Sequence, residues 1–136
     1  MGNQCLFMDP YLDPSHDPNR NNPAAGKPDP YWEPLRRALG QSRRFAERLD
    51  LASTQPYPEL ASSSFCLASP GSQYLVYVRQ GSEVTIDLSA APSRLNAEWT
   101  QPAEERQLPV ESCAGGSRKT FKVPFAGDAV LFLWRP

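Results

Sequence analysis

Histidine and cysteine are scarce in this sequence, which has one histidine, His16, and three cysteines among 136 residues. Cys5, Cys66 and Cys113 are widely spaced and odd in number, so at most one disulfide can form and no zinc site is expected. A Ser-His-Asp or Cys-His catalytic arrangement would depend entirely on His16, and we predict none. No glycine-rich phosphate loop occurs either, so no cofactor is expected.

Long apolar runs and an excess of basic residues are absent as well. The longest apolar runs, 74–78 and 129–134, are far shorter than the roughly 20 residues that span a bilayer, so no membrane segment is predicted. Fourteen Lys and Arg nearly balance fifteen Asp and Glu, and no basic cluster is interleaved with aromatic residues. Because nucleic-acid binding depends on such basic surfaces, no nucleic-acid partner is expected.

Proline, in contrast, is abundant, since fifteen prolines exceed the roughly 5% share of an average protein. Composition divides the chain into a polar, proline-rich start, a basic helical stretch and an alternating, strand-like remainder. Pro56, Pro58 and three consecutive serines favour turns or extended backbone between the last two regions. We therefore predict a first part at 1–52, a linker at 53–63 and a β domain at 64–136.

The first part combines a short buried strand with a helix. The apolar run 5–8 ends at Asp9-Pro10, as expected of a strand that proline stops, and a long Asp-, Asn- and Pro-rich loop follows. A lone buried strand needs neighbours, so we expect this part to be the truncated end of a larger body. From about 35 to 52, apolar residues recur at spacings of three, four and seven between arginines, which predicts an amphipathic helix.

The remainder alternates between apolar and polar residues in short segments. In the segment 83–88, Val84, Ile86 and Leu88 would face a core while Thr85 and Asp87 face water. Reversals at roughly ten-residue intervals predict antiparallel pairing. The predicted fold is therefore mainly β, an antiparallel β-sandwich of about seven strands that follows one short strand, a long loop and one amphipathic α-helix. The predicted strands are 64–69, 73–79, 83–88, 95–101, 107–112, 118–123 and 128–134.

Two of these segments carry further predictions. Both faces of the last strand, 129–134, are apolar, so it should lie centrally in its sheet or be covered by the helix or by a partner domain. Gly115-Gly116-Ser117 has the glycine content of a hairpin turn.

Candidate functional residues are few. Asp9, Asp13 and Asp17 are four residues apart, but they lack the alternate ligand positions, central glycine and final glutamate of a calcium loop, so no metal site is predicted. Asp9 and Asp13 would suit acid–base work on a sugar if they faced each other across a cleft. Flat aromatic rings bind sugars, and Tyr77 and Trp99 are the candidate ligand-binding residues, with core packing as the alternative for strand aromatics.

Several segments resemble known bacterial proteins. The first part resembles the end of the (β/α)₈ barrel of bacterial glycoside hydrolases, and the second half resembles the β domain that follows it, which is labelled a collagen-binding domain of a collagenase. The first similarity rests on Leu6-Phe7-Met8-Asp9-Pro10-Tyr11, Asp29-Pro30-Tyr31-Trp32-Glu33-Pro34-Leu35-Arg36-Arg37-Ala38-Leu39-Gly40 and Arg43-Arg44-Phe45-Ala46-Glu47-Arg48-Leu49-Asp50-Leu51. The second rests on Phe65-Cys66-Leu67-Ala68, Tyr74-Leu75-Val76-Tyr77, Val84-Thr85-Ile86-Asp87-Leu88, Glu98-Trp99 and Phe125-Ala126-Gly127-Asp128-Ala129-Val130-Leu131.

The resemblance implies that Asp9, Tyr11 and Asp13 are barrel-rim residues, because barrel active sites form at the C-terminal ends of the strands. The principal acids would come from earlier strands, so this chain alone is not expected to hydrolyse glycans. After Glu98-Trp99 the family continues with an aromatic residue and an Asn-Pro-Arg-x-Gly-like turn, whereas this chain has Thr100-Gln101-Pro102-Ala103-Glu104-Glu105, so that loop should differ in shape.

The sequence thus predicts a non-catalytic accessory sandwich whose partner is the catalytic barrel of a longer glycoside hydrolase, and which also contacts its substrate. A stand-alone module that binds polysaccharide or collagen is one alternative, and a small enzyme that uses Asp9 and Asp13 is another. For the longer protein we expect secretion or a periplasmic location.

Overall fold

The computed structural model describes residues 33–136, and the predicted strand at 5–8 and the long loop after it lie outside these described residues. The chain divides into two compact units, one ending at Arg43 and the other comprising Arg44–Pro136. The helix α1 (Glu33–Arg48) crosses this division, so its last turn belongs to the second unit.

The helix α1 confirms the predicted amphipathic segment but ends at Arg48 rather than near residue 52. A side chain from a distant strand explains the early end. The amide nitrogen of Gln73 donates to the carbonyl oxygen of Arg48 at 3.3 Å, and the amide oxygen of Gln73 accepts from the backbone N–H of Asp50 at 2.9 Å. The Asp50 carboxylate then accepts from the Ser53 hydroxyl at 2.8 Å, which closes a turn in place of further helix.

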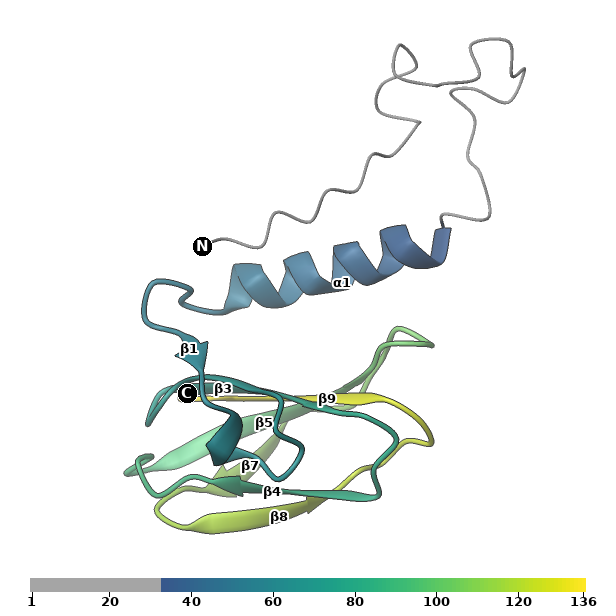
Figure 1. The fold of residues 1–136 in the computed structure, drawn as a ribbon. Helices are drawn as coiled ribbons and strands as arrows, with labels where there is room; N and C mark the ends of the chain where they lie inside the picture. Colours follow the sequence, from purple (N-terminus) through teal and green to yellow (C-terminus); the bar gives the residue numbers. More distant parts are fainter. Residues whose placement is uncertain (1–32) are drawn as a thin grey trace, which may run out of the picture. The chain divides into compact units, whose positions relative to one another are not determined.

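Nine strands follow the helix in the described part of the chain (Figure 1). Seven form a large sheet in the order β1, β2, β3, β9, β5, with β6 and β7 both paired to the far side of β5, and β4 pairs with β8 in a small second sheet. All pairings are antiparallel. The strands are β1 (Gln55–Pro56), β2 (Cys66–Ser69), β3 (Gln73–Val78), β4 (Glu83–Asp87), β5 (Arg94–Gln101), β6 (Arg106–Gln107), β7 (Glu111–Ala114), β8 (Arg118–Lys122) and β9 (Ala129–Trp134).

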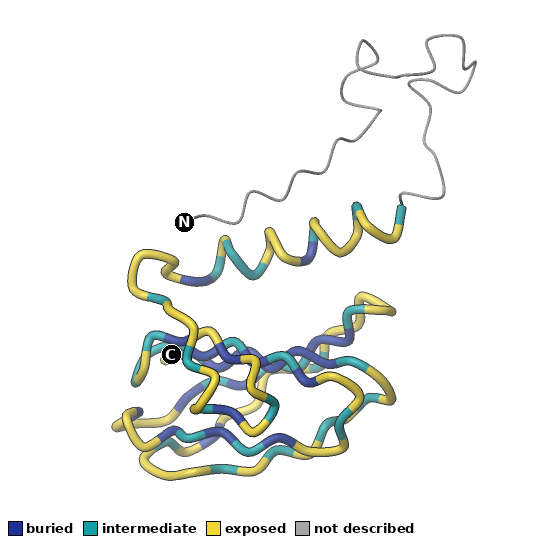
Figure 2. The backbone as a smooth tube through the Cα atoms, in the orientation of Figure 1, coloured by how far each residue is buried: buried dark blue, intermediate teal, exposed yellow. Residues whose placement is uncertain are grey.

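The two sheets pack face to face around one core, which confirms the predicted antiparallel β-sandwich. Buried positions alternate with more exposed ones along β3 and β4, as Figure 2 shows for the second unit. This alternation places every second side chain between the layers. The largest fully buried side chains are Tyr74, Val76, Val84, Ile86, Leu88, Leu95, Leu131 and Leu133.

The connections differ from the prediction in two places. Gly115-Gly116-Ser117 is not a hairpin turn, because it carries the chain from β7 in the large sheet to β8 in the small one. The predicted strand 107–112 is two strands, β6 and β7, because Pro109 has no N–H to donate to a continuous ladder.

The segment predicted as a linker also takes part in the sandwich. Gln55 and Pro56 form β1 and pair with Ala68 and Leu67 at the edge of the large sheet. Ala61, which is 4% exposed, bridges to Ile86 of β4 and belongs to the core. Residues between the helix and β2 therefore cover edges that the two sheets would otherwise leave open.

Candidate functional site

The large sheet has a second surface, which points away from the core and which we call the outer face. Several of its central side chains are aliphatic or aromatic. The strand registers align its side chains in rows across β2, β3, β9 and β5. One row runs through Leu67, Leu75, Phe132 and Glu98, and its neighbours contain Gln73, Trp134 and Asn96 on one side and Tyr77, Val130 and Thr100 on the other.

The last turn of α1 packs on the middle of this face. The ring of Phe45 meets the ring of Phe132 edge-on, with the ring centroids 6.4 Å apart. The guanidinium of Arg48 lies 4.6 Å from the centroid of Phe132 and 5.1 Å from that of Trp134, and these two rings stack 5.0 Å apart. Phe132 is only 2% exposed although it points away from the core. This packing explains why both faces of β9 are apolar, as the sequence indicated.

An ion pair completes this arrangement, which we call the Arg48 cluster and which consists of Phe45, Arg48, Glu98, Phe132 and Trp134. Nη1 of Arg48 donates to the Glu98 carboxylate at 2.5 Å, and the side chain of Glu98 is only 12% exposed. A carboxylate so far removed from water needs a charged partner, and the delocalised guanidinium supplies one while lying against aromatic rings. The cluster therefore fixes the helix end by charge and by packing together.

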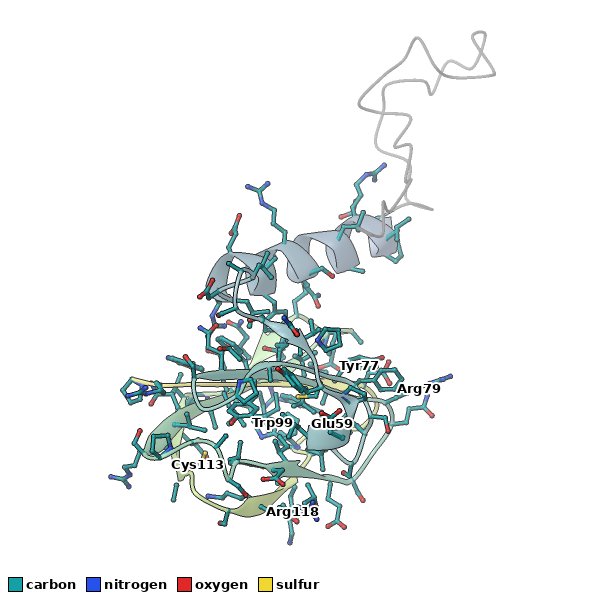
Figure 3. All side chains as sticks on the ribbon, turned by 60° about the vertical axis from the view of Figure 1, so that its left-hand side comes forward. Glu59, Tyr77, Arg79, Trp99, Cys113 and Arg118 are labelled. Carbon is teal, nitrogen blue, oxygen red and sulfur yellow. The ribbon has the colours of Figure 1, made fainter. Side chains whose placement is uncertain are left out.

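Tyr77 and Trp99, the predicted ligand-binding residues, lie on opposite faces of the large sheet (Figure 3). Tyr77 is paired with Val130 on the outer face, whereas Trp99 pairs with Leu131, a core residue. Trp99 is partly buried and packs against the core. The structure therefore does not bring the two rings together into one aromatic platform.

Tyr77 makes two contacts on the outer face. Its hydroxyl donates to the Asp128 carboxylate at 2.5 Å, and its ring meets that of Phe65 edge-on at 5.9 Å between centroids. The hydrogen bond to Asp128 raises the pKa of the Tyr77 hydroxyl above its ordinary value. Tyr77 is thus a neutral hydrogen-bond donor that holds Asp128 at the start of β9.

The barrel-rim candidates Asp9, Tyr11 and Asp13 lie outside the described residues. Across residues 33–136, no group of three or more His, Cys, Asp or Glu side chains is placed to hold a metal ion. In the same range, no helix is long and apolar enough to cross a membrane. Cys66 and Cys113 are both buried as free thiols, and burial raises the pKa of Cys66 to about 11, far from the reactive thiolate.

Sequence reasoning missed the residues that matter most at this site. In the sequence, Arg48 is one of several arginines between the apolar positions of the helix, and its partner Glu98 lies 50 positions further along the chain. The signal that pointed toward the site was the uninterrupted apolar run of β9, because a strand that is apolar on both faces requires a cover on its second face.

Comparisons with known proteins bear on this architecture. No family model matches the chain, and no curated protein matches it. Among solved structures, one described as a glycoside hydrolase superposes with a TM-score of 0.63 at 13% sequence identity, over 82% of this chain and 28% of its own. Another is a glycoside hydrolase family 5 protein from Bacteroides vulgatus ATCC 8482, with a TM-score of 0.58 and 16% identity over 78% of this chain and 25% of its own.

The chain therefore spans about a quarter of the length of these two glycoside hydrolases. At such low identity the similarity is one of fold. It shows that the architecture of this chain also occurs as a minor part of much longer hydrolase chains.

Proposed function

We propose that this chain is a non-catalytic accessory β-sandwich of a larger glycoside hydrolase, and that it packs on the catalytic barrel through α1. The observation that carries the proposal is the Arg48 cluster, in which the end of α1 is held on an apolar sheet face. The fold similarity to one quarter of longer glycoside hydrolases supports a role as one part of such a protein.

The helix itself has more apolar surface than the sandwich uses. Phe45 and Leu49 turn toward the sheet, and Leu49 is 8% exposed. Leu35 and Leu39 continue the same apolar stripe toward the start of the helix, since Leu35 and Leu49 are only about 40° apart around its axis at 3.6 residues per turn. They are 38% and 37% exposed. An apolar stripe that extends beyond the part packed on the sandwich suits a helix that also contacts a second body, here the proposed barrel.

The test uses the purified chain and the natural protein in its source cells. The purified chain is expected to release no reducing sugar from cellulose, xylan or mannan. An antibody raised against the sandwich is expected to recover a longer polypeptide that does hydrolyse a glycan. Recovery of a 136-residue polypeptide alone, or sugar release by the purified chain that Asp9→Ala abolishes, would overturn the proposal.

A second candidate is direct binding of polysaccharide or collagen. Phe65, which is 56% exposed beside Tyr77, favours it because an exposed ring can lie against a sugar or a peptide. Co-sedimentation of the purified chain with insoluble glycans and with collagen fibrils tests this role. Saturable binding that falls in Phe65→Ala but not in Val110→Ala, an apolar control that is 50% exposed, would support it.

A further inference from the structure

Most strand edges of the sandwich are short or covered. The strand β1, at one edge of the large sheet, has two residues and includes Pro56. The outer edge of β4 is bonded at its centre, because the carbonyl of Thr85 accepts from the N–H of Ser62 and its own N–H donates to the Ser62 hydroxyl, both at 2.9 Å. The strand β8 pairs only with β4, and its five residues form the longest open edge among the described strands (Figure 1).

The register shows which backbone groups of β8 are unpaired. The N–H of Val123, just past the strand, donates to the carbonyl of Ser82 at 2.8 Å. Bonded pairs alternate with unbonded pairs along an antiparallel ladder, so every second residue back from Val123 bonds to β4. The other three residues have N–H and C=O groups that point away from β4, and no described residue bonds to these groups. They are Arg118, Thr120 and Lys122.

The side chains of β8 are basic. Arg118, Lys119 and Lys122 occupy three of its five positions, and the strand has no acidic residue. A second copy of the chain is a poor partner for this edge, since an antiparallel match centred on Thr120 would put Arg118 of each copy opposite Lys122 of the other. Like charges directly opposite each other destabilise such a pair, and lysines protect open edges against self-pairing in this way. A strand that suits this edge therefore has the opposite charge.

The strand β4 shows which chemistry β8 accepts on its paired edge. Each end of β4 places a carboxylate opposite a cation of β8, and the carboxylate of Asp87 lies 3.2 Å from the guanidinium of Arg118. Between these ends the hydroxyl groups of Thr85 and Thr120 are 2.7 Å apart, and the two remaining residues of β4 are apolar and enter the core. An alternating acidic strand thus matches β8, and the free edge presents the same side chains to a second strand.

We propose that the free edge of β8 binds an extended acidic segment of another polypeptide as an added antiparallel strand. Backbone hydrogen bonds to the open groups of β8 hold the segment, and its carboxylates lie beside the basic side chains. Arg118 is already paired with Asp87, whereas neither lysine of β8 is ion-paired with a described residue, so the two lysines supply the free charge. The inference goes beyond the accessory role, because it holds whether or not a hydrolase barrel is present.

The test uses the whole 136-residue chain and a capped pentapeptide with the sequence of β4, Glu-Val-Thr-Ile-Asp. In two-dimensional NMR spectra, the peptide is expected to shift the amide signals of Arg118, Thr120 and Lys122 in a saturable way, and added salt should weaken the binding. A control peptide with lysine in place of both acids should bind roughly tenfold more weakly, because like charges then face each other.

Two matched pairs separate strand addition from simple charge attraction. Thr120→Pro removes an outward N–H at an edge position that tolerates proline, whereas Thr120→Ala keeps this N–H and loses the same hydroxyl. Binding should fall roughly tenfold in the proline variant and change little in the alanine variant. With the unaltered chain, N-methylation of the peptide's threonine should abolish binding and N-methylation of its valine should not, since only the threonine N–H points at β8 in this register.

Several results would overturn the proposal. These are the absence of saturable shifts, equal binding of the acidic and basic peptides, and equal binding of the two N-methylated peptides. The N-methylated pair decides the question even where Thr120→Pro fails to fold. Shifts of the same amides on raising the protein concentration without peptide would also overturn it, because a second copy of the chain would then occupy the edge.

Discussion

Replacement of Arg48 by alanine removes the cation from the Arg48 cluster and leaves Glu98 without its partner. The Glu98 side chain is 12% exposed, so its carboxylate would lose a charge-assisted hydrogen bond in a largely dry site. Such bonds contribute about 1.5–3 kcal/mol when a charged group is involved. The contacts with Phe132 and Trp134 add about 0.5–1 kcal/mol.

Solvent reduces the sum, because the Arg48 side chain is itself 33% exposed and the ion pair is partly screened. We therefore expect Arg48→Ala to lower the free energy of unfolding by about 2–3 kcal/mol. For a domain of this size, about 1 kcal/mol corresponds to a shift of roughly 4–8 °C, so the midpoint should fall by roughly 10–20 °C. Arg44→Ala, an exposed arginine one turn earlier, is the matched control and should change stability by less than about 0.5 kcal/mol.

The assay is guanidinium unfolding followed by circular dichroism and tryptophan fluorescence, with coincident transitions as the test of two-state behaviour. A double-mutant cycle with Glu98→Gln isolates the ion pair, and a coupling of about 1–2 kcal/mol is expected. A coupling below about 0.3 kcal/mol, or equal losses for Arg48→Ala and Arg44→Ala, would refute the argument that this contact fixes the helix end.

Three further predictions concern the core and the turns. Cys66 is buried with its pKa raised to about 11, so iodoacetamide at pH 8 should leave it unmodified in the native chain and label it after unfolding, as peptide mass spectrometry would show. Hydrogen bonds from Ser89 and Arg118 lower the pKa of the Asp87 carboxyl to about 2. The ionised carboxylate therefore stabilises the fold above about pH 4, and this contribution is lost as the pH falls toward 2. Asp87→Asn should therefore flatten the pH dependence of unfolding in that range, and an unchanged slope would contradict the assignment. Gly115→Ala places a Cβ 2.4 Å from the carbonyl oxygen of Ala91, so it should lower the free energy of unfolding, measured in urea, by about 1–3 kcal/mol. Gly40→Ala is the control, because a Cβ there meets open space within the helix, and it should raise the free energy of unfolding by about 1 kcal/mol.

Most strands could be located from the sequence because their burial pattern is local. Along β4, Val84 and Ile86 alternate with polar residues, and this alternation alone determines which side chains enter the core. Pro70-Gly71-Ser72 also marks a true reversal, since β2 and β3 on either side are paired. The predicted bounds of β3, β5 and β9 therefore differ from the observed ones by one residue at most.

Pairing between distant strands was not accessible in the same way. The strand β9 lies between β3 and β5 in the large sheet, and β4 pairs with β8, although β5, β6 and β7 separate these two strands in the sequence. The order of the strands in the sequence and the glycine turns had indicated hairpins between consecutive strands instead. Strand β1, at Gln55–Pro56, has no alternation at all and forms because the edge of β2 offers free backbone groups. Each of these pairings depends on which strand edges remain unpaired once the rest of the sheet has formed.

The sequence by itself determined that this protein is an antiparallel β-sandwich preceded by an amphipathic helix, because apolar periodicity and turn residues act over a few neighbouring positions. Only the tertiary structure decided that Arg48 meets Glu98 over two aromatic rings, that Gln73 ends the helix, and that Tyr77 and Trp99 lie on opposite faces. These contacts join residues far apart in the chain, and their geometry exists only after the strands have taken their register.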